Sequence, residues 1–186
     1  ANTRGVRHQL HFWEGDPLRC RADRPDLCLT DDFQRAVGLL KYYGMTFELQ
    51  GFSHQFVHFA ELARDHPETN FCLVHGGMLT SDDDATVDAW KAGLEHLVPL
   101  PNVWIKCSGL NFFTNSCDID HMRIMLDHVL DRFGAERCFY GSNFPLEKLW
   151  ARYDDLVGAC KQILAPRPEA DQRAFFHDTA AGFYRV

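Results

Sequence analysis

The sequence has no long hydrophobic run, and its cysteines form no paired motif. No stretch approaches the roughly 20 apolar residues that a membrane-spanning helix needs, and the first residues do not resemble a signal peptide. The seven cysteines are scattered, without a Cys-x-x-Cys pair. Such spacing favours reduced core thiols in a cytoplasmic protein over a disulfide framework or a zinc knuckle.

Basic residues are too few for a protein that binds nucleic acid. Nineteen Lys and Arg against 26 Asp and Glu give a net charge of −7, which disfavours nucleic acid and anionic membranes as partners. The 186 residues, 46% of them hydrophobic and 24% charged, suit a globular domain with a real core. Linkers, repeats and low-complexity stretches are also missing, so we expect residues 1–186 to form one domain.

Three familiar active-site motifs are absent as well. Neither Gly-x-Gly-x-x-Gly nor the phosphate-binding Gly-x-x-x-x-Gly-Lys-[Ser/Thr] occurs, which argues against a doubly wound nucleotide-binding fold. Cys107 next to Ser108 invites a nucleophile interpretation, but no Gly-x-Ser-x-Gly elbow surrounds the pair. We therefore look for the chemistry elsewhere.

What the sequence does contain is a regular alternation of strand and helix patterns. Five β-type runs cover residues 5–13, 46–50, 70–75, 103–108 and 137–143. Helical patterns follow them. The first helix is expected to be capped by Thr30 and to end at Gly44, and the third to begin at Ser81 with an acidic run. The other expected helices cover residues 56–63, 119–133, 148–164 and 169–184. Strict alternation predicts an α/β fold with a parallel sheet and helices outside it.

Polar residues stand at the end of strand after strand, and they predict where the site lies. These residues are His11, Gln50, His75, Ser108 and Asn143. Active sites at the carboxyl ends of the strands are typical of the (β/α)₈ TIM barrel, which takes about 250 residues. Five strands in 186 residues therefore predict an incomplete barrel.

Six segments, in order, resemble one family. They read GVRHQLHFW, FELQGFSHQ, FCLVHGGM, VWIKCSGL, RCFYGSNFPLEKLWARYDDL and the closing AAGFYRV. The set is similar to the amidohydrolase-2 type TIM-barrel hydrolases of the amidohydrolase superfamily, which include sugar lactonases and 2-pyrone-4,6-dicarboxylate lactonase. Members of that family begin earlier, with a strand that carries His-x-His. The resemblance thus implies that this chain is the C-terminal portion of such a barrel, as a fragment, an isoform or the product of a truncated gene.

The resemblance implies catalytic roles for His75 and Asn143. The histidine that matches His75 binds metal or polarises the substrate carbonyl, and many members have at position 143 an aspartate that ligates metal and activates water. An amide is a weak metal ligand and cannot act as a base near pH 7, so Asn143 is expected to orient a water or hold a substrate oxygen. A zinc or manganese ion is conceivable, but no metal ligand is assigned, because one imidazole and one amide make a poor site.

Five residues are expected to bind substrate at the mouth of the barrel: Arg7, His11, Gln50, Lys106 and Ser108. Arg7 and His11 share a strand face, as do Glu48 and Gln50. An arginine facing the barrel needs either a substrate carboxylate or an internal acid such as Glu48, and both interpretations stay open. Lys106 is included as a substrate-binding candidate, although membership of an ion pair is favoured over a role as base.

His54 and His58 have the spacing of a His-x-x-x-His zinc motif. Glutamine occupies the place of the catalytic glutamate, and no third ligand is near in the sequence. An exposed helix start is the better interpretation.

The expected function is hydrolysis of a carboxylated or sugar-derived lactone, a small-molecule substrate. A related decarboxylase is a variant of this hypothesis that relies more on metal. The alternative is a non-catalytic, truncated barrel that acts by oligomerising or by binding a partner, because missing strands would leave two open sheet edges. In either case little turnover is expected of the 186 residues alone.

Overall fold

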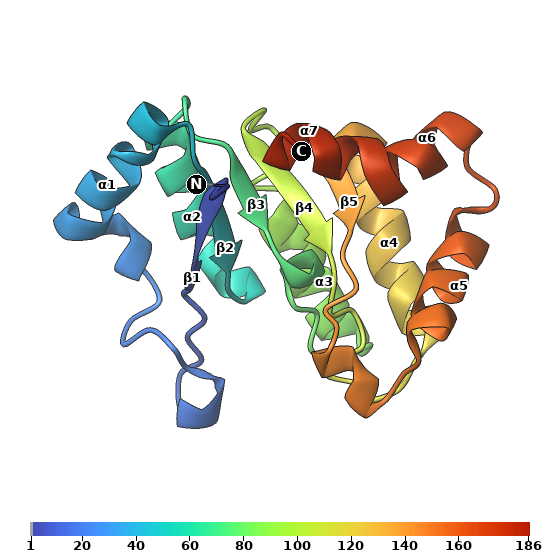
Figure 1. Ribbon diagram of the computed structural model, residues 1–186. Helices are drawn as coiled ribbons and strands as arrows, with labels where there is room; N and C mark the ends of the chain where they lie inside the picture. Colours follow the sequence, from blue (N-terminus) through green and yellow to red (C-terminus); the bar gives the residue numbers. More distant parts are fainter. Residues whose placement is uncertain (1) are drawn as a thin grey trace.

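The computed structural model describes residues 2–186 and is built around one five-stranded parallel sheet (Figure 1). The strands are β1 (Gly5–Gln9), β2 (Thr46–Gln50), β3 (Phe71–Leu73), β4 (Val103–Cys107) and β5 (Cys138–Tyr140). Each strand pairs in parallel with the next one along the chain. This order is that of a (β/α)₈ barrel with part of its wall missing, as predicted, although β1 ends four residues earlier than expected.

The first four helices connect the strands, and the last three follow β5. They are α1 (Asp31–Gly38), α2 (Phe56–Asp65), α3 (Asp84–Leu94), α4 (Ile119–Phe133), α5 (Tyr153–Leu164), α6 (Glu169–Arg173) and α7 (Thr179–Tyr184). Two predictions need correction. The helix expected from residue 148 begins at Tyr153, after a 3₁₀ turn at Leu146–Leu149, and the run expected over residues 169–184 contains a π-turn at Ala174–Asp178.

Acidic side chains cap two of these helices. Asp83 accepts a hydrogen bond from the Thr86 amide at 2.9 Å and so starts α3, as the acidic run after Ser81 predicted. Asp118 does the same for α4. Thr30 lies at the start of α1, but its hydroxyl donates to the Leu27 carbonyl instead of capping the helix.

One face of the sheet packs against α2 to α5 and forms the main core. Alternate strand residues point to that face because side chains alternate along a strand. They include Phe47, Leu49, Phe71, Leu73, Val103 and Ile105, all nearly or fully buried. Each such side chain contributes about 1.5–3 kcal/mol when fully buried, so this face holds most of the fold together.

The C-terminal helix α7 covers part of the other face. Figure 1 shows α7 at the edge of the sheet where the strands begin, in front of β4 and β5. Phe183 packs on Trp104 and Phe139, with ring centroids 5.3 and 5.5 Å apart. Tyr184 reaches further and donates a hydrogen bond to Glu48. Because α7 covers only this half, the other half, where the strands end, stays open.

Two expectations about the chain as a whole can be compared with the structure. Within residues 2–186 no helix has the length and apolar character to cross a bilayer. All seven cysteines are free thiols, and Cys28, Cys72, Cys107, Cys138 and Cys160 are buried.

Candidate active site

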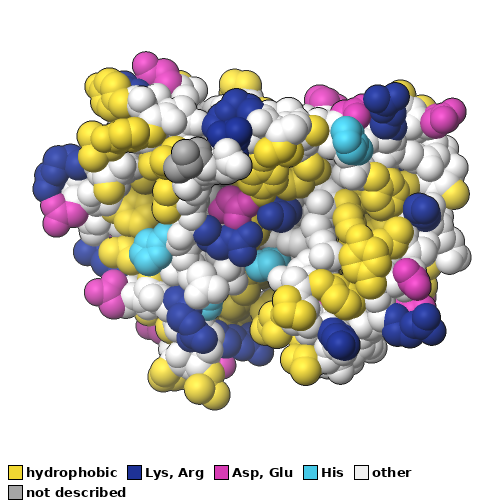
Figure 2. All heavy atoms as spheres, in the orientation of Figure 1, with side chains coloured by type: hydrophobic (Ala, Val, Ile, Leu, Met, Phe, Trp, Pro, Cys, Tyr) yellow, Lys and Arg dark blue, Asp and Glu magenta, His cyan; other side chains and the backbone are white. Residues whose placement is uncertain are grey.

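A cleft of about 340 Å³ opens on the inner face of the sheet, where the strands end. Figure 2 shows this face hollowed near its centre, with basic side chains (dark blue) and His side chains (cyan) around the hollow. Of the predicted strand-end residues, His11, Gln50, His75 and Asn143 line the cleft. Ser108 does not line it but lies behind His75. The parallel strands therefore bring together residues that are up to 132 positions apart in the sequence.

His75 follows β3 and has a left-handed backbone, with φ +58°. Its Nδ1 lies 3.2 Å from the Ser108 carbonyl oxygen and 3.1 Å from the Ser108 hydroxyl. A carbonyl oxygen can only accept, so Nδ1 carries the proton and Nε2 is the nitrogen left for a ligand. Burial, reinforced by the positive charge of Arg7, lowers the pKa of His75 to about 4. The imidazole is therefore neutral near pH 7.

Asn143 follows β5 and also has a left-handed backbone, with φ +54°. Asparagine is one of the few residues with a side chain that tolerate this conformation. Its Nδ2 donates to Glu147 Oε1 at 3.2 Å. Two polar residues of one cleft thus adopt a conformation that is costly for residues other than glycine, a feature that clusters at functional sites.

Gly109 separates the two side chains and was missed by the sequence analysis. Its φ is +59°, and a Cβ at this position would lie 2.7 Å from His75 Nδ1 and 3.0 Å from Asn143 Nδ2. Only glycine permits such an approach. The Gly that follows Ser108 in the sequence was the available signal, because glycine at a strand end often marks close contact.

Arg7 has the internal acid partner that the sequence left as one of two alternatives. Arg7 and Glu48 form an ion pair across β1 and β2, and Lys106 Nζ lies 3.3 Å from Glu48 Oε1 and 3.0 Å from the Tyr184 hydroxyl. Burial alone would raise the pKa of Glu48, but the Tyr184 hydrogen bond and the charges of Lys106 and Arg7 lower it. Lys106 therefore lies below the cleft as a member of this network, whereas Arg7 also lines the cleft.

Two further arginines, Arg19 and Arg21, line the cleft and were also missed. The Arg19 guanidinium lies 5.1 Å from the Trp13 ring centroid and 5.8 Å from that of Phe113, so aromatic rings hold it in place. Burial, together with the charge of Arg21, lowers the pKa of His11. Among the described residues that line the cleft none is Asp or Glu, so its wall is cationic.

The remaining predicted residues have simple positions. Gln50 Oε1 accepts a long, 3.5 Å hydrogen bond from Gln9. His54 is exposed, as expected, in the 3₁₀ turn Ser53–Gln55 that leads into α2. Its ring contacts those of Phe52 and Trp13.

A parallel β/α sheet with a polar cleft at the carboxyl ends of its strands defines a protein of the β/α-barrel class. The chain belongs to the amidohydrolase family: the model of that family, described as "Amidohydrolase", matches residues 1–186. The family resemblance expected from the sequence is thereby confirmed.

Similar proteins extend the comparison. The chain is 32% identical to the uncharacterised protein y4mH of Sinorhizobium fredii over 186 residues, covering 100% of this chain and 62% of the relative. It is 30% identical to an L-fucono-1,5-lactonase of Burkholderia multivorans over 197 residues, covering 100% of this chain and 64% of the relative. A crystal structure of an amidohydrolase from Burkholderia multivorans with bound zinc superposes with a TM-score of 0.87 at 28% identity, over 98% of this chain and 64% of that one. The chain thus spans less than two thirds of the length of these relatives.

The donors of this cleft do not make a zinc site by themselves. Catalytic zinc is normally held by three protein ligands. Residues 2–186 contain no group of three or more His, Cys, Asp and Glu side chains that could hold a metal ion. At the cleft the donors left for a metal are His75 Nε2, the His11 imidazole and the weak amide oxygen of Asn143. A zinc ion here would need ligands beyond these.

Proposed function

We propose that the protein is a hydrolase that opens a lactone bearing a carboxylate. The observation that carries this proposal is the hydrogen bond of His75 Nδ1 to the Ser108 carbonyl, which leaves Nε2 unprotonated in the cleft. A relative named L-fucono-1,5-lactonase supports the lactone as the substrate class.

His75 then acts as a base on water. Water attacks the lactone carbonyl, and Nε2 accepts the proton that the water loses. The ring C–O bond then breaks, and the leaving ring oxygen takes that proton from Nε2 to become the hydroxyl of the hydroxy acid. Since the neutral imidazole has no hydrogen on Nε2, a role as base fits this arrangement better than polarisation of the carbonyl by donation. Asn143 lies beside His75 and can orient the water, but it cannot accept the proton.

The cationic wall of the cleft selects the substrate. Arg19 forms a surface ion pair with Asp16 at 3.4 Å, in which the two side chains are 40% and 39% exposed, whereas Arg7 is paired with Glu48, whose side chain is only 11% exposed. The Arg21 guanidinium donates to the Cys20 carbonyl. An arginine fork binds a carboxylate with two parallel hydrogen bonds. We therefore assign the substrate carboxylate to Arg19 and Arg21. The sequence offers Arg7 as the residue that binds this carboxylate, but Arg7 is paired with Glu48.

The test measures acid release from a panel of lactones, with and without a carboxylate. The protein assayed is this chain joined to the N-terminal barrel portion that the family resemblance implies, because little turnover is expected of the 186 residues alone. His75→Ala should lower kcat by about 100-fold or more, the usual effect of losing a general base. His96→Ala is the matched control, because His96 is exposed and lies outside the cleft. Arg19→Ala and Arg21→Ala should raise KM for carboxylated lactones more than for neutral ones. Unchanged turnover in His75→Ala would refute the assignment.

A second candidate function is self-association through β1. This edge strand is exposed, and an apolar groove beside it is lined by Val6, Phe33, Leu40 and Phe47, among others. Val6 is 43% exposed, and open strand edges of this kind favour pairing with another chain. Light scattering of the native chain and of Val6→Lys would test it, because a dimer that uses this edge should dissociate in the variant.

The buried free thiols fit a reducing compartment, so we also propose a cytoplasmic location. Fractionation of cells that produce the protein would test this.

A further inference from the structure

Glu147 is a buried carboxylate directly beneath Asn143. Only 1% of its surface is exposed. Its Oε1 accepts from Asn143 Nδ2 at 3.2 Å, and its Oε2 accepts from the Trp150 indole at 2.6 Å. Both donors are neutral, so the carboxylate is held by hydrogen bonds from uncharged groups.

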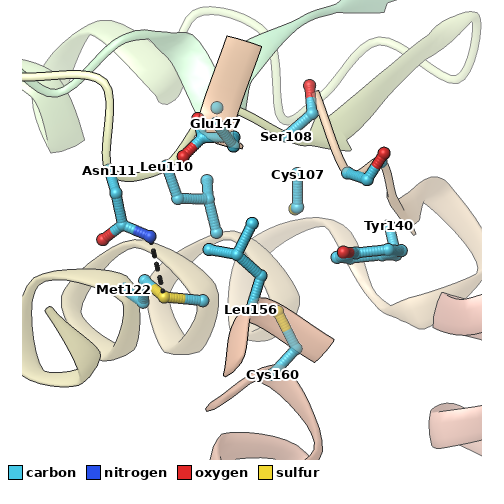
Figure 3. A pocket seen from close by; sticks show the side chains of 12 residues that line it. Cys107, Ser108, Leu110, Asn111, Met122, Tyr140, Glu147, Leu156 and Cys160 are labelled. Carbon is cyan, nitrogen blue, oxygen red and sulfur yellow. Dashed lines mark hydrogen bonds between the residues drawn. The ribbon is translucent and has the colours of Figure 1, made fainter. Parts of the chain in front are cut away.

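The surroundings of Glu147 make this burial costly. A small pocket beside it is lined by Cys107, Leu110, Met122, Leu156 and Cys160 and by the polar but uncharged residues Ser108, Asn111, Tyr140 and Ser142 (Figure 3). An ionised carboxyl group in such a place loses hydration that two neutral donors only partly replace. A hydrophobic side chain of similar size would cost less at this position, so packing alone does not account for a carboxylate.

The hydrogen bond to Asn143 has a definite direction. An ionised carboxylate has only acceptor atoms, so the amide of Asn143 must turn its NH₂ group toward Glu147. Its carbonyl oxygen then points away from Glu147, and Asn143 lines the cleft. The same contact accounts for an amide at position 143: an aspartate there would place a second carboxylate within about 3 Å of the first, where like charges repel.

We propose that Glu147 is a positioning residue that fixes the Asn143 amide, so that Oδ1 is the group offered to the cleft. In that orientation Asn143 accepts a hydrogen bond from the attacking water or from a substrate hydroxyl. The identity of that ligand rests on the proposed function, but the orientation of the amide does not.

The first experiment is independent of activity. In the NMR spectrum of the native chain, one Nδ2 proton of Asn143 should be shifted downfield and exchange slowly with solvent, as expected for a bond to a carboxylate. Glu147→Gln replaces one acceptor oxygen by an NH₂ donor with little change in shape. The remaining oxygen should keep the shorter bond from the Trp150 indole, at 2.6 Å against 3.2 Å for Asn143, so the variant should abolish both features. Trp150→Phe should keep them, because it removes only the other hydrogen bond of Glu147. Identical Asn143 signals in the native chain and Glu147→Gln would overturn the proposal.

The second experiment measures lactone turnover by the same extended protein, in which this chain is joined to the N-terminal barrel portion. Glu147→Gln should lower kcat about tenfold with little change in KM, the size expected for one misdirected hydrogen bond in the transition state. Asn143→Asp combined with Glu147→Gln should restore most of kcat, because the pair is again complementary and an acceptor again faces the cleft. Glu169→Gln, at an exposed site, is the control.

The results separate the two proposals. If no lactone is hydrolysed while the NMR signals change as expected, the proposed function fails and the positioning of Asn143 stands. If Glu147→Gln keeps the native kcat, or if the double variant is no better than Glu147→Gln, the positioning role is refuted whatever the substrate.

Discussion

Acid should destabilise this protein through His75, and the effect can be isolated with one substitution. The pKa of His75 falls from its ordinary value of 6.5 to about 4 on folding. Each pKa unit is worth about 1.4 kcal/mol, so the difference corresponds to about 3 kcal/mol. Water in the cleft screens the charge, which makes this value a ceiling.

The sign follows from which state binds the proton. Between pH 6.5 and about 4 the unfolded chain protonates this histidine and the folded chain does not, so stability is full above pH 6.5 and falls as the pH falls to about 4. Urea unfolding at pH 7.5 and at pH 4 gives the loss for the native chain and for His75→Gln.

Burial also lowers the pKa values of His11, His54, His66 and His128, so the comparison must be between variants. His75→Gln should lose up to about 3 kcal/mol less than the native chain over this range. Equal losses in the native chain and in His75→Gln would show that the cleft does not keep this imidazole neutral.

Three further outcomes are expected. Gly109→Ala should destabilise the fold by at least about 1–2 kcal/mol in thermal unfolding, because φ is +59° and the new Cβ meets His75. Gly158→Ala in α5 is the control: its Cβ meets nothing within 4 Å, so this variant should be neutral or stabilising. Glu48→Gln should cost on the order of 3 kcal/mol in urea unfolding, since it leaves Lys106 without its buried counter-charge, and a loss below about 1 kcal/mol would contradict the role of this network. Calorimetric titration with Zn²⁺ should reveal no stoichiometric site tighter than about micromolar in the 186-residue chain, because the cleft offers too few ligands; a tighter site would point to donors outside it.

The general architecture could be predicted from the sequence because its signals are local. The alternation of strand and helix patterns, the helix over residues 119–133 and the acidic cap of α3 all depend on neighbours within a few positions. The strand-end residues could be placed at one edge for the same reason, since parallel strands end on the same side. The sequence therefore predicts that His75 and Asn143 share a cleft.

The partners of those side chains were decided by tertiary structure. Ser108 holds His75 across 33 positions, Tyr184 reaches Glu48 across 136, and the loop that carries Arg19 contacts Phe113 from the other side of the cleft. Such contacts depend on how the strands twist and how far each loop extends, which no local pattern specifies.

The contrast is clearest at position 143. The sequence determined that an amide, and not a base, stands at the end of β5. Only the fold decided which way the amide points, because Glu147 lies in a turn whose direction depends on packing against Trp150 and the α5 segment. A hydrogen bond needs a partner at about 3 Å in the right direction, and that geometry exists only once the chain is folded.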